Sequence, residues 1–136
     1  MVFLKVVNNY LIYMSMQDLM SDFVARINNS VLSKNTTSEV LKNNIVLNTV
    51  KKLTKLGFFD SFDVLERTII VTLKANKINS IKRVSKPGRR IYSPYNKIPK
   101  LFGGHGFYIL STPSGIMTNI ESYNSKNGGE ILFSIF

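Results

Sequence analysis

The sequence contains no cysteine and a single histidine, His105. The lack of cysteine excludes disulfide scaffolds, thiolate metal sites and cysteine nucleophiles. One histidine is too few for the usual multi-histidine metal sites, and it leaves little for acid–base catalysis by imidazole. We therefore expect no metal, no cofactor and no enzymatic activity.

Acidic residues are also scarce, with 8 Asp and Glu against 18 Lys and Arg and a formal net charge of +10. No Asp or Glu lies between Glu66 and Glu121, and nine basic residues fall within residues 74–100, with Tyr92 and Tyr95 among them. Clustered cations neutralise phosphates, and aromatic rings can stack on unpaired bases. The pattern predicts a polyanionic partner; the alternative is a solvated basic surface. The nine are Lys74, Lys77, Lys82, Arg83, Lys86, Arg89, Arg90, Lys97 and Lys100.

Long apolar runs are missing as well, so no segment is expected to span a membrane. The first 13 residues, MVFLKVVNNYLIY, have one Lys and no Arg, which does not fit a transit peptide, and they lack a signal-peptide pattern. We interpret them as an additional strand or arm. The whole chain has 136 residues and is 44% hydrophobic, which suits one folded domain or two small lobes and not a disordered basic tail.

The first half has the patterns of helices and strands in alternation. Apolar residues recur at helical spacing after Ser15, a candidate N-cap, and the pair Asn28-Asn29 suits the end of that helix. A polar loop over residues 30–38 and a short extended segment over 39–42 follow. A second helix over 43–56 fits a cap at Asn43 or Asn44, basic side chains in its last turns and Gly57 just beyond its end. Residues 68–73 and 78–84 favour strands.

The second half is rich in turn residues, with all four prolines within residues 87–113 and six of the eight glycines within residues 103–129. Short strands fit 90–92, 107–110, 115–118 and 131–136, and short helices fit 97–102 and 119–126. The predicted fold class is α+β, with an N-terminal α/β domain of two helices on a small sheet and a small, mainly β C-terminal domain. The predicted boundaries are 1–14 for the extension, 15–79 for the first domain and 80–136 for the second.

Three hydroxyls and a glycine gather in residues 111–115, STPSG, between two predicted strands. Such groups can bond to sugar, phosphate and base edges, although the same residues are ordinary in turns. The glycines at 103–106 lack the spacing of a phosphate-binding loop, so we expect a bend with His105 on its rim. A hydrolase triad of Ser111, His105 and Asp60 or Asp63 has no G-x-S-x-G motif to support it.

Several segments resemble one family. Residues 15–29, 83–92, 104–118 and 128–131, which include VSKPGRRIY and STPSGIMT, resemble the bacterial-type small-subunit ribosomal protein eight family in order and spacing. The resemblance covers residues 14–136, and the first 13 residues have no counterpart in it. It implies an N-terminal α/β domain, a mostly β C-terminal domain and binding to the central domain of small-subunit ribosomal RNA early in platform assembly.

The resemblance also implies which residues contact RNA. The loop at residues 111–115 would bind an irregular minor-groove region of an RNA stem. Arg89, Arg90 and Tyr92 would lie in or beside that RNA-binding surface. Two departures bear on the details. The usual third serine of the loop is Pro113, so its contact is absent or passes to Ser114, and a Ser-Lys pair is Asn43-Asn44, so a phosphate contact is lost or moves to Lys42. The expected contacts are Ser111, Thr112, Ser114, Gly115, Gly128, Gly129, Glu130, Arg89, Arg90, Tyr92, Lys86 and Lys42.

The expected function is therefore that of a structural constituent of the small ribosomal subunit. The alternative is a repressor that binds messenger RNA through the same surface and regulates its own synthesis. Expected partners are small-subunit ribosomal RNA and neighbouring ribosomal proteins, without a membrane or a small-molecule substrate. The 14 Asn, 14 Ile and 13 Lys have A/T-rich codons, which favours an organellar genome. We expect a mitochondrial ribosome, with a plastid or a bacterial cytoplasm as alternatives.

Overall fold

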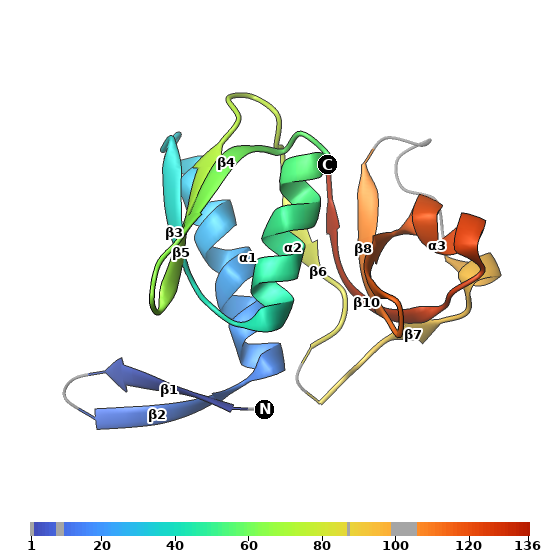
Figure 1. Ribbon diagram of the computed structural model, residues 1–136, viewed down its shortest axis with the longest axis horizontal. Helices are drawn as coiled ribbons and strands as arrows, with labels where there is room; N and C mark the ends of the chain where they lie inside the picture. The colour runs from blue at the N-terminus through green and yellow to red at the C-terminus, as the bar shows by residue number, and fades with distance from the viewer. Residues whose placement is uncertain (1, 8–9, 87, 99–105) are drawn as a thin grey trace.

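A computed structural model describes residues 2–7, 10–86, 88–98 and 106–136, with side chains described from residue 19 onward. It has an α+β fold, as predicted (Figure 1). The elements are β1 (Val2–Val7), β2 (Tyr10–Ser15), α1 (Met16–Leu32), β3 (Thr37–Leu41), α2 (Asn44–Lys55), β4 (Phe59–Val64), β5 (Thr68–Leu73), β6 (Ile81–Arg83), β7 (Tyr92–Ser93), the 3-10 helix η1 (Tyr95–Lys97), β8 (Phe107–Thr112), β9 (Gly115–Thr118), α3 (Asn119–Ser125) and β10 (Gly129–Ile135).

The N-terminal sheet has the antiparallel order β3-β5-β4. In β5 the alternate residues Ile69, Val71 and Leu73 are buried, as the period of two requires for a strand with one covered face. Helices α1 and α2 cover that face (Figure 1). The side chain of Asn43 accepts a hydrogen bond from the Val46 N–H at 2.7 Å, which confirms the predicted N-cap of α2.

The C-terminal sheet has the order β6-β10-β8-β9, and β7 also pairs with β10. All of its pairs are antiparallel. β10 runs through the middle and is buried over residues 130–135. The two long helices lie between the two sheets, so that their opposite sides each meet a sheet (Figure 1).

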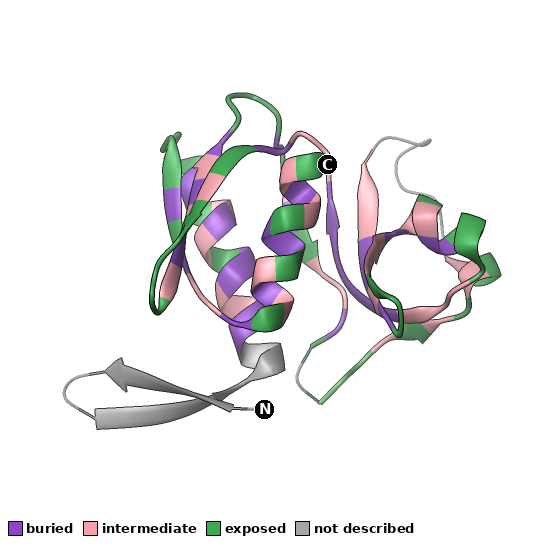
Figure 2. Ribbon diagram, viewed as in Figure 1, coloured by how far each residue is buried: buried purple, intermediate pink, exposed green. Residues whose placement is uncertain are grey.

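One hydrophobic core joins the two halves. It includes Phe23 on α1, Val71 on β5, and Ile109 and Phe133 on β8 and β10, all fully buried. Figure 2 shows the buried positions on the inward sides of both long helices and along β10. The predicted boundary at residues 79–80 therefore crosses a continuous core, and the division into two domains stays a prediction.

Helix α1 is longer than predicted. It runs to Leu32, through residues expected to be a loop, and Asn28 does not end it. Instead the Asn28 side-chain amide donates to the Ile81 carbonyl at 2.6 Å and accepts from the Ile81 N–H at 3.0 Å. This side chain attaches β6 to α1. The polar residue at position 28 is therefore explained by a hydrogen-bonding partner 53 residues away in the sequence and not by a helix end.

Other elements differ from the predictions at their ends. The predicted N-terminal strand or arm is an antiparallel pair, β1 with β2, and the strand predicted over 78–84 is reduced to β6. The predicted helix over 97–102 falls mostly outside the described residues. Just before it, the described residues form the 3-10 helix η1, which ends at Lys97. No helix in the described part of the chain is long and apolar enough to cross a membrane.

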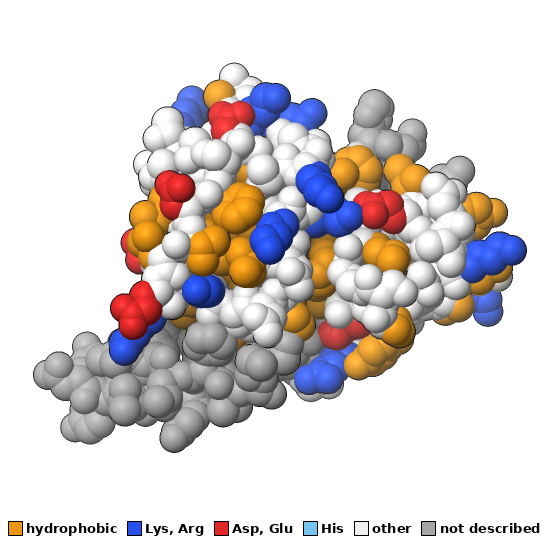
Figure 3. Space-filling view, in the orientation of Figure 1, with side chains coloured by type: hydrophobic (Ala, Val, Ile, Leu, Met, Phe, Trp, Pro, Cys, Tyr) orange, Lys and Arg blue, Asp and Glu red, His pale blue; other side chains and the backbone are white. Residues whose placement is uncertain are grey.

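One lysine of α2, Lys52, forms an ion pair and is not merely solvated. Lys52 Nζ lies 2.9 Å from Glu121 Oε2 on α3, whereas Lys51 and Lys55 are exposed. Glu121 also takes part in the N-terminal cap of α3, because its N–H donates to the hydroxyl of the N-cap residue Thr118 and its carboxylate accepts from the same hydroxyl. Figure 3 shows an acidic side chain against basic ones on this face of the molecule.

Candidate nucleic-acid interface

The hydroxyl loop is the tight turn between β8 and β9. Thr112 and Gly115 are paired across it, and Gly115 has a φ of 114°, a conformation that favours glycine. The Thr112 hydroxyl donates to the Gly115 carbonyl at 2.8 Å and accepts from the Ser114 N–H at 3.2 Å. Thr112 is buried, so its hydroxyl holds the loop in shape and is not presented to a partner.

The two serines of the loop remain accessible. Ser114 is exposed, and Ser111 is half-buried with no side-chain hydrogen bond to another described residue. Asn127 Nδ2 donates to Ser114 Oγ at 3.4 Å, a contact that no sequence pattern had indicated. The serine hydroxyls and the exposed turn backbone can accept and donate hydrogen bonds to an RNA groove.

Gly128 and Gly129 allow the chain to pass close to the hydroxyl loop. A Cβ atom at Gly128 would lie 2.7 Å from the Ser93 carbonyl oxygen, and one at Gly129 would overlap the Ser111 carbonyl oxygen. The pair thus lets β10 fit between β7 and β8, with Glu130 opposite Ser111. Glycine is required here by close packing rather than by an unusual backbone angle.

Tyr92 lies on the opposite side of β10 from the loop. It pairs with Glu130 through the backbone, and the residue is 64% exposed. Glu130 is buried between the strands. Ser111, Glu130 and Tyr92 therefore occupy adjacent strands, β8, β10 and β7, so the structure brings together these three predicted contacts.

The predicted cations form a turn before β7. The backbones of Lys86 and Arg89 exchange two hydrogen bonds, at 3.0 and 2.9 Å, and Arg90 follows directly. All three side chains are exposed and form no hydrogen bond or ion pair with another described residue. Arg83 is different, because its guanidinium contacts the Ser85 carbonyl and the Ser21 hydroxyl. Lys86, Arg89 and Arg90 are therefore available to a polyanion, whereas the Arg83 side chain holds the segment that follows β6 in place.

Lys42 lies apart from this group, between β3 and α2. Its Nζ donates to the Leu65 carbonyl at 3.2 Å, and its N–H bonds to the Arg67 carbonyl. Arg67 is exposed in the turn between β4 and β5, and it was not predicted as a contact. Its place beside Lys42 depends on the pairing of β3 with β5, which the sequence alone did not reveal.

The residues considered for a hydrolase triad lie on different sheets. Asp60 and Asp63 are exposed on β4, Ser111 is on β8, and His105 lies outside the described residues. Within the described part of the chain, no group of three or more His, Asp or Glu side chains could hold a metal ion.

The fold and this surface define a class of small, basic α+β proteins in which a glycine-framed hydroxyl loop lies beside exposed cations. Residues 18–136 match the family model described as ribosomal protein S8. The chain belongs to the ribosomal protein S8 family, as its motifs predicted.

Curated relatives match along almost their whole length. "Small ribosomal subunit protein uS8c" of Euglena gracilis is 38% identical, over 88% of this chain and 97% of the relative. "Small ribosomal subunit protein uS8" of Synechocystis is 37% identical, over 90% of this chain and 100% of the relative. The uS8 of Campylobacter hominis is 35% identical, over 89% and 99%.

Proposed function

We propose that this protein is a structural constituent of the small ribosomal subunit, that it binds the central domain of the small-subunit ribosomal RNA and that it supports assembly of the platform. The observation that carries the proposal is the juxtaposition of the β8–β9 hydroxyl loop, the Gly128-Gly129 passage and Tyr92 on neighbouring strands. Family membership supports the same function.

In this mechanism the protein recognises the shape of an RNA stem. Ser111 and Ser114 bond to the sugar edge of a minor groove, where small side chains permit close approach. Lys86, Arg89 and Arg90 neutralise nearby phosphates and supply affinity that depends on salt. Thr112 acts indirectly by holding the turn, and Tyr92 offers an exposed ring for stacking on a base.

The test replaces Ser111 and Ser114 with alanine together and measures binding to the protein's own small-subunit RNA by filter titration. Losing two hydrogen bonds of about 1 kcal/mol each predicts roughly a 10- to 30-fold weaker affinity. The matched control replaces two exposed serines of the other lobe, Ser33 and Ser61, and should bind as the wild type does. Equal affinity of the loop variant and the wild type would contradict the loop assignment.

A repressor of messenger RNA would use the same surface, so these variants do not separate the two functions. Sedimentation at high salt does, because a constituent of the subunit remains with it and a free repressor does not. We place the protein in a plastid or bacterial ribosome rather than a mitochondrial one. Relatives of chloroplast and bacterial type support this choice, and the mitochondrial expectation has no such support.

A further inference from the structure

The connection between α3 and β10 contains an Asn-Gly pair, Asn127-Gly128 (Figure 1). Asn127 is half-buried beside the hydroxyl loop, and its Nδ2 donates to Ser114 Oγ at 3.4 Å and to Ser125 Oγ at 3.2 Å. An asparagine that precedes glycine is chemically labile, because glycine has no side chain to keep its amide nitrogen away from the asparagine carboxamide. The pair therefore has the composition of a spontaneous deamidation site.

Deamidation at such a pair proceeds in two steps and needs only water. First, the deprotonated amide nitrogen of Gly128 forms a bond to Asn127 Cγ. The Cγ–Nδ2 bond breaks, and Nδ2 takes a proton from water and leaves as ammonia, so that a succinimide ring remains. Water then opens the ring at one of its two carbonyl carbons. Opening at Cγ yields aspartate, and opening at the main-chain carbonyl carbon yields isoaspartate, whose main chain is longer by one methylene group.

The attacking nitrogen is unoccupied in the folded protein. The Gly128 N–H forms no hydrogen bond with another described residue. Two other exposed asparagines differ in this respect. The N–H that follows Asn79 bonds to the Phe136 carbonyl at 3.1 Å, and the N–H that follows Asn76 bonds within its own turn at 3.3 Å. The Asn-Gly pair thus combines the smallest possible neighbour with an unbonded nitrogen.

Glycine is required at position 128 for packing. A Cβ atom there would lie 2.7 Å from the Ser93 carbonyl oxygen and 2.9 Å from the Cα atom of Pro94. Any other residue would push the start of β10 away from β7. The close packing of the predicted RNA-binding surface therefore places a glycine after Asn127, and the chemical lability of the pair comes with it.

Both products would disturb the hydroxyl loop. An aspartate carboxylate cannot donate to Ser114, so the Ser114 hydroxyl would donate to the carboxylate instead of to RNA. The carboxylate is ionised at neutral pH, and it adds a negative charge where phosphates approach. Isoaspartate lengthens the chain immediately before Gly128, whose close fit against Ser93 leaves no room for a shift. Either product is therefore expected to bind RNA more weakly.

We propose that Asn127 is a spontaneous deamidation site and that its conversion removes unassembled protein from the pool that binds RNA. RNA on the hydroxyl loop covers the neighbouring carboxamide and limits the local opening that ring closure needs, so bound protein is protected. The consequence for binding rests on the proposed function, whereas the modification itself does not.

The first experiment incubates the free protein at mildly alkaline pH, where the glycine nitrogen is deprotonated more often, and maps its peptides by mass spectrometry. We expect the mass change of an amide converted to a carboxyl group, together with isoaspartate detected by enzymatic methylation, at Asn127 before any at Asn76, Asn79 or Asn124. The Asn127→Gln protein is the control and should stay unchanged, because glutamine must close a larger ring. An unmodified Asn127, or equal conversion at the other asparagines, would overturn the proposal.

The second experiment measures RNA binding by the Asn127→Asp protein, which is one of the two products. Filter titration against the small-subunit RNA should show an affinity about 5- to 10-fold lower, as for one lost hydrogen bond and one added negative charge. The matched control is Asn124→Asp, which adds the same charge to an exposed position of α3 that has no hydrogen bond to the loop. It should bind within about twofold of the wild type. Equal losses in the two variants would refute the role of the contact with Ser114.

The third experiment repeats the incubation with saturating small-subunit RNA. Conversion of Asn127 should slow several-fold, and equal rates with and without RNA would rule out protection of the bound protein. A wild type that binds no RNA would refute the proposed function together with the consequence for binding. The peptide map of the free protein would still decide whether Asn127 is modified, so the two failures are distinguishable.

Discussion

At the scale of single residues, Pro113 limits the number of hydrogen-bonding groups that the hydroxyl loop presents. It is exposed at the second position of the Thr112–Gly115 turn, where proline fixes φ and lacks an N–H. The turn is thereby stiffened, and one hydroxyl that the resemblance led us to expect is missing. The neighbouring Thr112 hydroxyl cannot replace it, because both of its hydrogen bonds stay within the turn.

Pro113→Ser should therefore tighten binding to the small-subunit RNA. One added hydrogen bond of about 1 kcal/mol predicts roughly five-fold higher affinity. The same change should lower the free energy of unfolding by up to about 1 kcal/mol, because serine restores freedom to the unfolded chain. Filter titration and thermal unfolding measure the two effects. Pro113→Ala is the control for stiffness alone, and equal binding by the serine and alanine variants would argue against the added contact.

Some residues could be assigned from sequence, and others only from their neighbours in space. The loop serines and the glycine pair belonged to recognisable strings, and the pairing of β8 with β10 brings the two strings together. Thr112 belonged to the same string, yet its hydroxyl turns inward, since burial is not encoded in the motif. Arg83 likewise counted as a surface cation until its guanidinium was seen bonded to backbone and Ser21.

At the scale of elements, helix lengths and strand ends show what local patterns can and cannot predict. The second helix was predicted to within a residue or two, because a cap, an apolar stripe and Gly57 agree on its limits. The first helix was predicted too short, because two asparagines in sequence looked like an end. The side chain of Asn28 is instead occupied by β6, and such a contact has no local signature.

Asn28→Ala should detach β6 from α1 and destabilise the protein. It removes two hydrogen bonds and leaves the Ile81 N–H and carbonyl without them, at a cost of about 2–3 kcal/mol. Thermal unfolding should show a fall in Tm of roughly 10 °C. Asn29→Ala, on the exposed side of the same turn, is the matched control and should unfold close to the wild type. Equal Tm values for the two variants would show that the amide does not secure β6.

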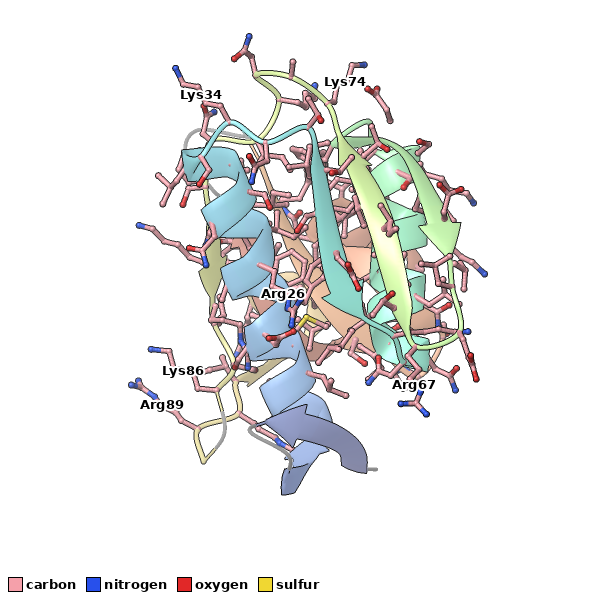
Figure 4. The ribbon with its side chains drawn as sticks, turned by 90° about the vertical axis from the view of Figure 1, so that its left-hand side faces the viewer. Arg26, Lys34, Arg67, Lys74, Lys86 and Arg89 are labelled. Carbon is pink, nitrogen blue, oxygen red and sulfur yellow. The ribbon has the colours of Figure 1, made fainter. Side chains whose placement is uncertain are left out.

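At the scale of the whole molecule, positive charge is the feature with the widest consequences. The protein has a net charge of +10, and Figure 4 shows basic side chains near both ends of α1, among them Lys34 and Lys74 at one end and Lys86 and Arg89 at the other. Sequence reasoning identified the excess and its concentration in residues 74–100. It could not divide that stretch between two ends of the fold, because the division depends on how β5, β6 and α1 pack.

The affinity for RNA should fall steeply as salt rises. Each phosphate contact contributes roughly 0.7–0.9 to the slope of log K against log salt concentration. Replacing Lys86, Arg89 and Arg90 with alanine together should reduce the steepness by about 2–3 while leaving Tm almost unchanged, since all three are exposed. Filter titrations at about 50–200 mM potassium chloride measure both proteins. A wild-type slope near zero would contradict the role assigned to these cations.

The central position of β10 also determines when this protein can become functional during its own synthesis. β6, β7 and β8 are each paired with β10, and Ile81 pairs with Ile135, which lies 54 positions later in the sequence. During translation, β6, β7 and β8 are therefore synthesised before β10, the strand with which all three pair. The hydroxyl loop can form as a local hairpin, but its alignment with Tyr92 awaits residues 129–135. The RNA contacts proposed for this surface therefore become available only when the last strand of the sheet has been synthesised.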